Sequence, residues 1–191
     1  RKFPLALDLG CRGGEIAAAL RGRGAIETLV QCDLSAAMAR RAAANGNPTL
    51  AADEEALPFA PESFDLVISG LSLHWVNDLP GCLLQVRQCL KPDGLFLAAM
   101  LGGDTLYELR QSLMEAELAE DGGVSPRVSP FADLRDAGGL LQRAGFALPV
   151  VDGDRLTVTY VDTLKLMHDL RGMGETSAIR MRARRPVSQV I

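Results

Sequence analysis

The sequence lacks the marks of several large protein classes. No apolar run in its 191 residues reaches the roughly 20 residues of a membrane-spanning helix, and no signal peptide is visible, although the chain begins at Arg1 rather than at methionine. Basic residues are not in excess, and a net charge of −4 argues against broad nucleic-acid binding. We therefore expect neither a membrane span nor a nucleic-acid partner.

Residues that bind metals are scarce and poorly spaced. The two histidines, His74 and His168, do not form an H-x-D pair, so the sequence does not indicate a non-haem iron triad. The four cysteines, at positions 11, 32, 82 and 89, include no C-x-x-C pair and match no zinc spacing. We predict no metal site and expect free, buried thiols in a reducing cytoplasm, with disulfides as the alternative.

The chain does contain an alternation of short apolar runs and helical patterns. Its apolar fraction of 48% over 191 residues is enough for one substantial core but not for two typical domains. Strands separated by helices indicate a parallel sheet covered on both faces. The expected fold class is α/β, with a single Rossmann-like, doubly wound, mainly parallel sheet and a C-terminal antiparallel hairpin. The domain is expected to cover residues 1–185, followed by a tail over 186–191.

The expected elements follow from periodicity and from turn residues. Ser35 is predicted to cap the Ala-rich helix that follows it. The segments 147–151 and 155–160 flank an Asp-Gly-Asp turn and are predicted to form the closing hairpin. Strands are expected at residues 5–9, 28–33, 49–52, 64–69 and 95–100, and helices at 14–21, 36–44, 79–90, 105–120, 133–144 and 162–170.

The first expected strand leads into a glycine-rich turn that begins with an acidic residue, Asp8-Leu9-Gly10-Cys11-Arg12-Gly13-Gly14. Such a turn before a helix presents backbone N–H groups and lets a ligand come close. Asp8 would repel the pyrophosphate of a dinucleotide and attract the ammonium and sulfonium groups of S-adenosyl-L-methionine. The dinucleotide pattern G-x-G-x-x-G also fails, because Arg12 and Glu15 occupy its later glycine positions. The predicted cofactor-binding residues in this turn are Asp8, Gly10, Cys11, Arg12 and Gly14, and NAD is a remote alternative.

Acidic residues follow the next two strands. Asp33 ends the second strand, where an open α/β sheet faces its cofactor, and its carboxylate would accept both ribose hydroxyls. The alternative role of Asp33 is a helix cap. Asp53 would accept a hydrogen bond from an adenine amino group, or it belongs to an ordinary solvated acidic loop. The predicted cofactor-binding set also includes Leu34, Glu54, Ser69 and Leu71, which lie beside these strand ends or after the fourth strand.

Candidate catalytic residues follow the fourth and fifth strands. His74 and Trp75 would line the substrate side of the crevice, although a lone histidine among apolar residues is more often structural. Asp104, Tyr107 and Arg110 come after the fifth strand, at the edge where substrates bind, or they simply cover the surface of the next helix.

These residues together resemble the class I S-adenosylmethionine-dependent methyltransferases over nearly the whole chain. The runs at 71–80 and 102–110, with shorter ones at 52–55 and 172–175, are similar to the family of respiratory complex I assembly factor 5 and its bacterial relatives. The cofactor half is also similar to the malonyl-carrier-protein O-methyltransferases of biotin synthesis. Arg12 departs from the superfamily pattern at its middle glycine, so Gly13 is expected to take the positive φ. The Arg12 side chain then either crowds the methionine moiety or pairs with its carboxylate.

The resemblance implies a protein that binds S-adenosyl-L-methionine and acts on a protein substrate, a subunit of complex I. The reaction implied is methyl transfer or the hydroxylation of an arginine. A small-molecule or carrier-protein O-methyltransferase and a non-catalytic, cofactor-stabilised assembly factor are the alternatives. A polar loop at 122–130 and basic residues at 180–185 fit a protein partner, although a solvated tail is the simpler interpretation of the latter. The expected location is the bacterial cytoplasm, or the mitochondrial matrix in a eukaryote.

Overall fold

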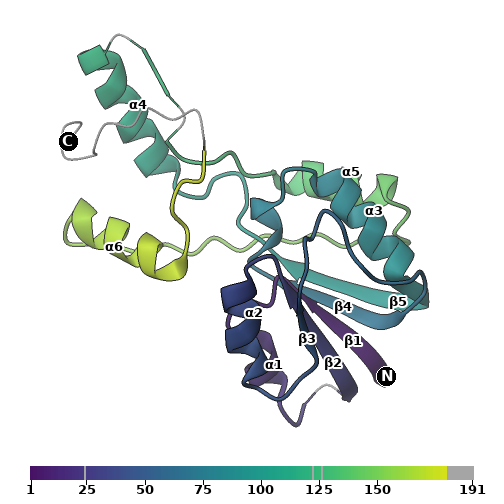
Figure 1. The fold of residues 1–191 in the computed structure, drawn as a ribbon. Coiled ribbons are helices and arrows are strands. Elements are labelled where there is room, and N and C mark those ends of the chain that lie inside the picture. Colours follow the sequence, from purple (N-terminus) through teal and green to yellow (C-terminus); the bar gives the residue numbers. More distant parts are fainter. Residues whose placement is uncertain (24, 122, 126, 180–191) are drawn as a thin grey trace. The chain divides into compact units, whose positions relative to one another are not determined.

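The computed structural model describes residues 1–23, 25–121, 123–125 and 127–179 (Figure 1). The chain divides into two compact units. Unit 1 comprises Arg1–Gly102 and Leu134–Val151, and unit 2 comprises Gly103–Asp133 and the chain from Asp152 onward. The boundary expected at residue 185 stays a prediction, because it and the basic residues 180–185 lie outside the described part of the chain.

Unit 1 contains a five-stranded sheet in which every strand pair is parallel. The strand order is β3-β2-β1-β4-β5, so the chain moves to one side of β1 and then returns to the other (Figure 1). Polar side chains at the carboxyl ends of β1 and β4 therefore face a topological switch point, where open α/β sheets bind ligands. The expected α/β fold is confirmed. The strands are β1 (Phe3–Leu9), β2 (Ile26–Asp33), β3 (Thr49–Ala51), β4 (Phe64–Gly70) and β5 (Leu90–Ala99).

Helices cover both faces of this sheet, as Figure 1 shows. On one face Ala17 of the first helix packs with Leu29 and Leu66, and on the other Val86 packs with Leu7 and Phe64. The Ser35 cap is confirmed, because its Oγ accepts the Met38 N–H at 3.4 Å. The helices of unit 1 are α1 (Glu15–Leu20), α2 (Ala36–Ala43), α3 (Leu79–Cys89) and α5 (Leu134–Arg143), with a 3-10 turn, η1, at Leu73–Trp75.

Two sequence-based expectations are not met along the sheet. Residues 147–160 form no strand, and Leu156 and Val158 are 88% and 66% exposed. Their alternation matches a strand, but no partner strand buries one face of it, so the closing hairpin is not confirmed. The strand expected at 95–100 also begins earlier, because β5 starts at Leu90 and includes the Lys-Pro-Asp-Gly run at 91–94. A register shift opposite Phe64 and Leu66 accommodates this irregular stretch.

Unit 2 contains the helices α4 (Tyr107–Asp121) and α6 (Thr163–Met173), which confirm two expected elements. Asp162 caps α6 by accepting the Lys165 N–H at 2.8 Å, and Gly174 ends the helix in the left-handed region with φ 83°. Among the helices described, none has the length and apolar character needed to cross a membrane.

Candidate cofactor site

The turn after β1 packs so closely on its neighbours that only glycine fits at position 10. Gly10 has a φ of 68°, and a Cβ there would lie 1.9 Å from Ser72 Oγ. The Cys11 N–H then donates to the Cys32 carbonyl at 2.9 Å, which joins the turn to the end of β2. The turn is thus fixed at the carboxyl ends of β1 and β2 and beside the segment that follows β4.

Asp8 lies fully buried at the end of β1, directly opposite Gln31 on β2. Gln31 Nε2 approaches Asp8 Oδ2 at 3.5 Å, while Asp8 Oδ1 has no hydrogen-bond partner within the described part of the chain. Burial raises the pKa of Asp8 to about 6, an effect that the Gln31 contact opposes. A buried carboxylate with an unpartnered oxygen would be stabilised by a cationic group. The sequence analysis did not identify Gln31 as a site residue. A single amide side chain within an otherwise apolar stretch of strand could have indicated a buried polar contact.

Asp33 joins two backbone segments through its two carboxylate oxygens. Oδ2 accepts the Arg12 N–H and Oδ1 accepts the Ser35 N–H, both at 2.8 Å. The side chain is therefore held at the carboxyl edge of the sheet, as the ribose hypothesis requires. Each oxygen retains acceptor capacity for a further donor, because a carboxylate oxygen carries two lone pairs.

The backbone of the turn differs from its expected form. The positive φ falls on Arg12, at 51°, and not on Gly13. With this backbone conformation the Arg12 N–H reaches Asp33. The hydrogen bond offsets the strain of a positive φ at a residue other than glycine. Gly14 also has a positive φ of 86°, and Asn45 Nδ2 donates to its carbonyl at 3.1 Å.

The acidic loop after β3 contains one exposed and one buried carboxylate. Asp53 is exposed, and its Oδ1 accepts the Glu55 N–H at 2.8 Å. Glu54 is buried, and its Oε1 accepts from Ser72 Oγ at 3.2 Å. Burial raises the pKa of Glu54. Asp53 thus remains available to a ligand at the surface, whereas Glu54 faces the interior between the strand ends.

The remaining residues of the carboxyl edge in unit 1 lie at the end of β4, just after it, or after β2. Ser69 is buried, and its Oγ has no hydrogen-bond partner within the residues described. Leu34 and Leu71 are exposed apolar side chains, and Leu71 has a φ of 53°. The rings of His74 and Trp75 lie 5.7 Å apart at 42°. The other predicted residues of the cofactor site lie on the strand ends and turns of unit 1.

The three candidates after β5 belong to unit 2. Asp104 forms an ion pair with Arg155 at 2.7 Å, but both side chains are more than 70% exposed, so the pair contributes little to stability. The Tyr107 hydroxyl donates to Glu108 at 3.1 Å. Arg110 donates to the carbonyls of Gly103 and Thr105, at 3.5 Å and 3.3 Å, and so holds the turn that enters α4.

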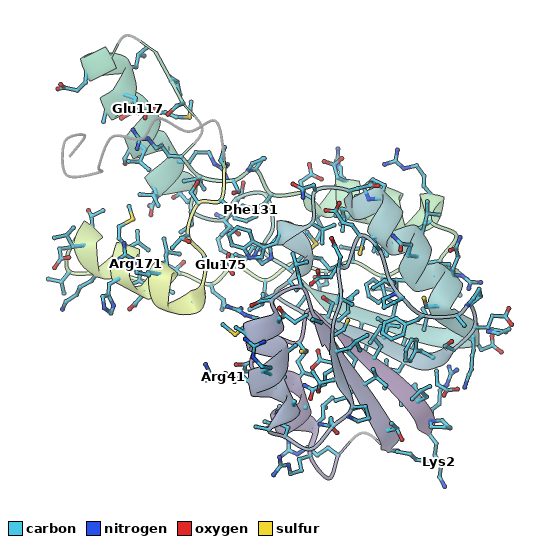
Figure 2. All side chains as sticks on the ribbon, in the orientation of Figure 1. Lys2, Arg41, Glu117, Phe131, Arg171 and Glu175 are labelled. Atoms are coloured by element: carbon cyan, nitrogen blue, oxygen red, sulfur yellow. The ribbon has the colours of Figure 1, made fainter. Side chains whose placement is uncertain are left out.

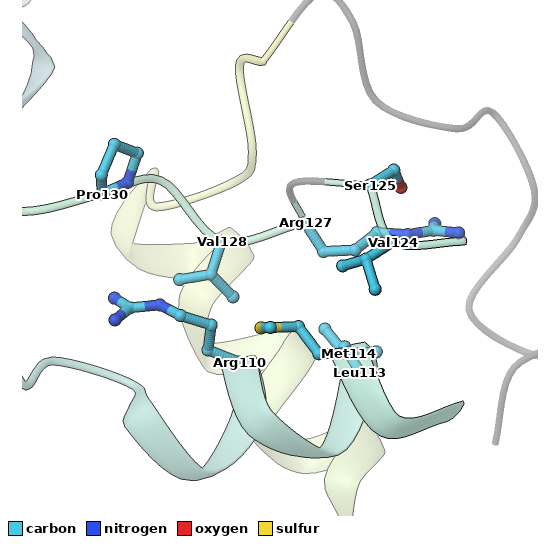
Figure 3. Close-up of a pocket in the computed structure, with 8 residues that line it drawn as sticks. All are labelled: Arg110, Leu113, Met114, Val124, Ser125, Arg127, Val128 and Pro130. Atoms are coloured by element: carbon cyan, nitrogen blue, oxygen red, sulfur yellow. The ribbon is translucent and has the colours of Figure 1, made fainter. Parts of the chain in front are cut away.

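An open pocket of about 410 Å³ lies between α4 and the polar loop that follows it (Figure 3). Glu117 lies on α4 (Figure 2). It accepts from the Ser125 N–H at 2.7 Å and pairs with Arg127, both of which line the pocket. The Ser125 amide, more than the Arg127 charge, lowers the pKa of Glu117. Sequence reasoning did not single out this buried acid. The pocket is lined by Arg110, Leu113, Met114, Val124, Ser125, Arg127, Val128 and Pro130.

The geometry at the edge of unit 1 fits S-adenosyl-L-methionine. Asp8 supplies a buried carboxylate with an unpartnered oxygen, Gly10 places no side chain at its own position in the turn, and Asp33 is fixed at the end of β2. Within the described residues, no group of three or more His, Cys, Asp or Glu side chains is placed to hold a metal ion. The expectation of four free, buried cysteines is confirmed.

The sequence is similar to known methyltransferases and to NDUFAF5 proteins. A family model described as a methyltransferase domain matches residues 7–98. The human arginine-hydroxylase NDUFAF5, mitochondrial, is 51% identical over 179 residues, which are 93% of this chain and 52% of the human protein. The malonyl-[acyl-carrier protein] O-methyltransferase of Xylella fastidiosa is 36% identical over 181 residues, 92% of this chain and 59% of that protein.

A crystal structure of an S-adenosylmethionine-dependent methyltransferase from Mesorhizobium loti matches with a TM-score of 0.59 and 23% identity, covering 78% of this chain and 77% of that one. This likeness shows the fold. The chain spans about half the length of the NDUFAF5 proteins that it matches. The chain therefore matches a methyltransferase domain over residues 7–98 and is a relative of NDUFAF5.

Proposed function

We propose that the protein binds S-adenosyl-L-methionine at the carboxyl edge of its sheet. In this proposal Asp8 balances the positive charge of the methionine moiety, Asp33 accepts the ribose hydroxyls and Asp53 accepts the adenine amino group. Gly10 and Cys11 line the turn, and Leu34 and Leu71 offer apolar surface to the ligand. The cofactor, when bound, supplies an electrophilic methyl group on sulfonium.

We further propose that the protein modifies a side chain of a protein substrate during the assembly of respiratory complex I. The observation that carries this proposal is the identity of about half of all residues with the NDUFAF5 proteins over 179 positions. Those relatives are named arginine hydroxylases, which suggests arginine as the modified side chain. Hydroxylation inserts an oxygen atom and therefore requires an oxidant and electrons, whereas methyl transfer requires only the cofactor.

Each unit contains its own candidates for substrate binding in this proposal. His74 follows β4 and is a candidate for contact with the reacting side chain. Asp104, Tyr107 and Arg110 are candidates for contact with the protein partner, and the open pocket beside Arg110 supports that assignment. The protein would act in the bacterial cytoplasm, or in the mitochondrial matrix of a eukaryote.

A carrier-protein O-methyltransferase is the second candidate, supported by 36% identity with the malonyl-carrier-protein enzyme of Xylella fastidiosa. A non-catalytic assembly factor that uses bound cofactor to stabilise a docking surface is the third. The first two consume cofactor, and the third binds it without turnover.

One experiment separates these candidates. The gene is deleted in its host, and complex I is purified from the deletion strain and from the strain complemented with the wild-type gene. Mass spectrometry of its subunits should find one arginine heavier by an oxygen or a methyl group in the complemented strain only. An arginine with the same mass in both strains would reject the proposed modification, and loss of complex I in the deletion strain without any such mass difference would support the third candidate. Methyl transfer from labelled cofactor to a malonylated carrier protein would instead establish the second candidate.

A further inference from the structure

Two adjacent acidic side chains hold both ends of one short segment beside the cofactor edge. Glu54 accepts from Ser72 Oγ at 3.2 Å. Glu55 Oε1 accepts the Asn77 N–H at 2.6 Å, the Asn77 Nδ2 group at 3.1 Å and the Asp78 N–H at 3.3 Å. The acidic loop after β3 therefore brackets residues 72–77 from its two sides.

The same loop is anchored to α3 by a single glutamine. Gln85 Nε2 donates to the Glu55 carbonyl at 2.8 Å, and Gln85 Oε1 accepts the Leu57 N–H at 2.9 Å. The loop backbone thus has fixed contacts on the helix, while its two carboxylates reach the bracketed segment. The hydrogen bonds from the loop carboxylates to residues 72–78 have a charged acceptor, and such bonds are stronger than neutral ones.

The bracketed segment carries two neighbouring aromatic rings, His74 and Trp75. His74 and Trp75 form its single 3-10 turn, with ring centroids 5.7 Å apart, and Trp75 is 38% exposed. Leu71, just before the segment, has a left-handed backbone conformation that is costly for any residue with a Cβ atom. Segments with such strained backbone persist only where their surroundings fix them.

We propose that Glu55 is a positioning residue that couples the adenine end of the cofactor site to the His74–Trp75 turn. Its neighbour Asp53 is the residue assigned to adenine, so occupancy there fixes the loop and, through Glu55, fixes residues 72–77. This inference rests on the proposed binding of S-adenosyl-L-methionine. Glu55 does not touch the cofactor or the reacting atoms in this scheme, and it acts through the segment that it holds.

Trp75 is the only tryptophan of the chain, so its fluorescence reports on this turn directly. The full chain is titrated with S-adenosylhomocysteine and, separately, with adenosine, which carries the adenine and ribose but no methionine moiety. Calorimetry measures affinity in parallel. Both ligands should change the Trp75 emission of the wild type, because the coupling begins at the adenine end.

The decisive variant is Glu55→Ala, which removes the carboxylate that Asn77 and Asp78 contact. It should bind S-adenosylhomocysteine within about threefold of the wild type but lose at least half of the emission change at saturation. Glu55→Gln keeps an acceptor oxygen and should recover part of the change. The matched control is Glu27→Ala, an exposed acid on β2 remote from the carboxyl edge, which should behave as wild type.

The outcomes distinguish this inference from the function on which it rests. A full emission change in Glu55→Ala overturns the coupling and leaves cofactor binding intact. A loss of the change that Glu27→Ala shares equally also overturns it. An absence of calorimetric binding in the wild type overturns the proposed cofactor itself. If Glu55→Ala does not fold, the Asn77→Ala variant, which removes only the Nδ2 contact, should still reduce the emission change, and an unreduced change rejects the inference.

Discussion

The carboxylate of Asp8 and the amide of Gln31 lie side by side on neighbouring strands, both fully buried, with one oxygen of each lacking a partner in the described residues. A buried acid in this state destabilises the empty site and favours a cationic ligand. The stability of the unliganded protein therefore depends on pH through Asp8, which lies at the start of the turn proposed to bind the cofactor.

Asp8→Asn should stabilise the unliganded protein and weaken cofactor binding. Burial raises the pKa of Asp8 from 3.8 to about 6, so between these pH values the folded state retains a proton that the unfolded chain has released. The stability of the unliganded wild type therefore falls as pH rises from about 4 to about 6, and the loss persists at neutral pH.

The variant lacks this loss and should gain up to about 3 kcal/mol at pH 7, measured by denaturant unfolding. Its affinity for S-adenosylhomocysteine should fall at least about tenfold, since the negative charge is gone. Glu27→Gln, at an exposed position near the start of β2, is the control. An Asn variant with unchanged affinity would remove Asp8 from the cofactor site.

Asp33→Ala should reduce both affinity and stability. The variant loses two hydrogen bonds to a charged acceptor, from the Arg12 and Ser35 amides, and two more to the ribose if that assignment holds. Each such bond contributes roughly 1.5–3 kcal/mol, so calorimetry should show a loss of affinity of at least about tenfold. A folded variant with a near-normal dissociation constant would restrict Asp33 to its structural role.

Arg12→Gly should raise stability by about 0.5–1 kcal/mol, because glycine adopts a φ of 51° without strain. We expect affinity for S-adenosylhomocysteine to fall nonetheless, since a guanidinium paired with the cofactor carboxylate would be lost. A melting curve and a calorimetric titration measure the two effects. Tighter binding by the glycine variant would mean that the side chain crowds the ligand.

Tyr107→Phe and Arg110→Ala should preserve cofactor binding and abolish complex I maturation in a deletion strain. The Tyr107 hydroxyl contacts only Glu108 among the hydrogen bonds described for it, so its removal should change stability by no more than about 0.5 kcal/mol. Arg110→Ala should cost about 1 kcal/mol, because the carbonyls of Gly103 and Thr105 lose their donor. Glu120→Ala, an exposed change on the same helix, is the control, and full rescue by both variants would exclude α4 from the substrate site.

The parts of the fold that sequence predicted are those governed by local chemistry. Apolar runs such as Phe64–Ser69, the Ser35 cap and the Gly10 turn carry their signals within a few residues. The bonds of Glu55 to Asn77 and of Gln31 to Asp8 join positions more than 20 residues apart, and no local pattern identifies such pairs. The positive φ of Arg12 was missed for the same reason, because its amide bonds to Asp33 on another strand.

The four buried cysteines allow local opening of the protein to be measured by thiol labelling. Burial raises the pKa of Cys11, Cys32 and Cys82 to about 12, and it also raises that of Cys89, so none presents a thiolate to a reagent while the chain is folded. The rate at which a thiol reagent labels each site therefore counts the openings of its surroundings. Cys11 lies in the glycine-rich turn and Cys89 at the end of α3. Comparing their labelling rates in the wild-type protein therefore separates local opening of the turn from unfolding of the core.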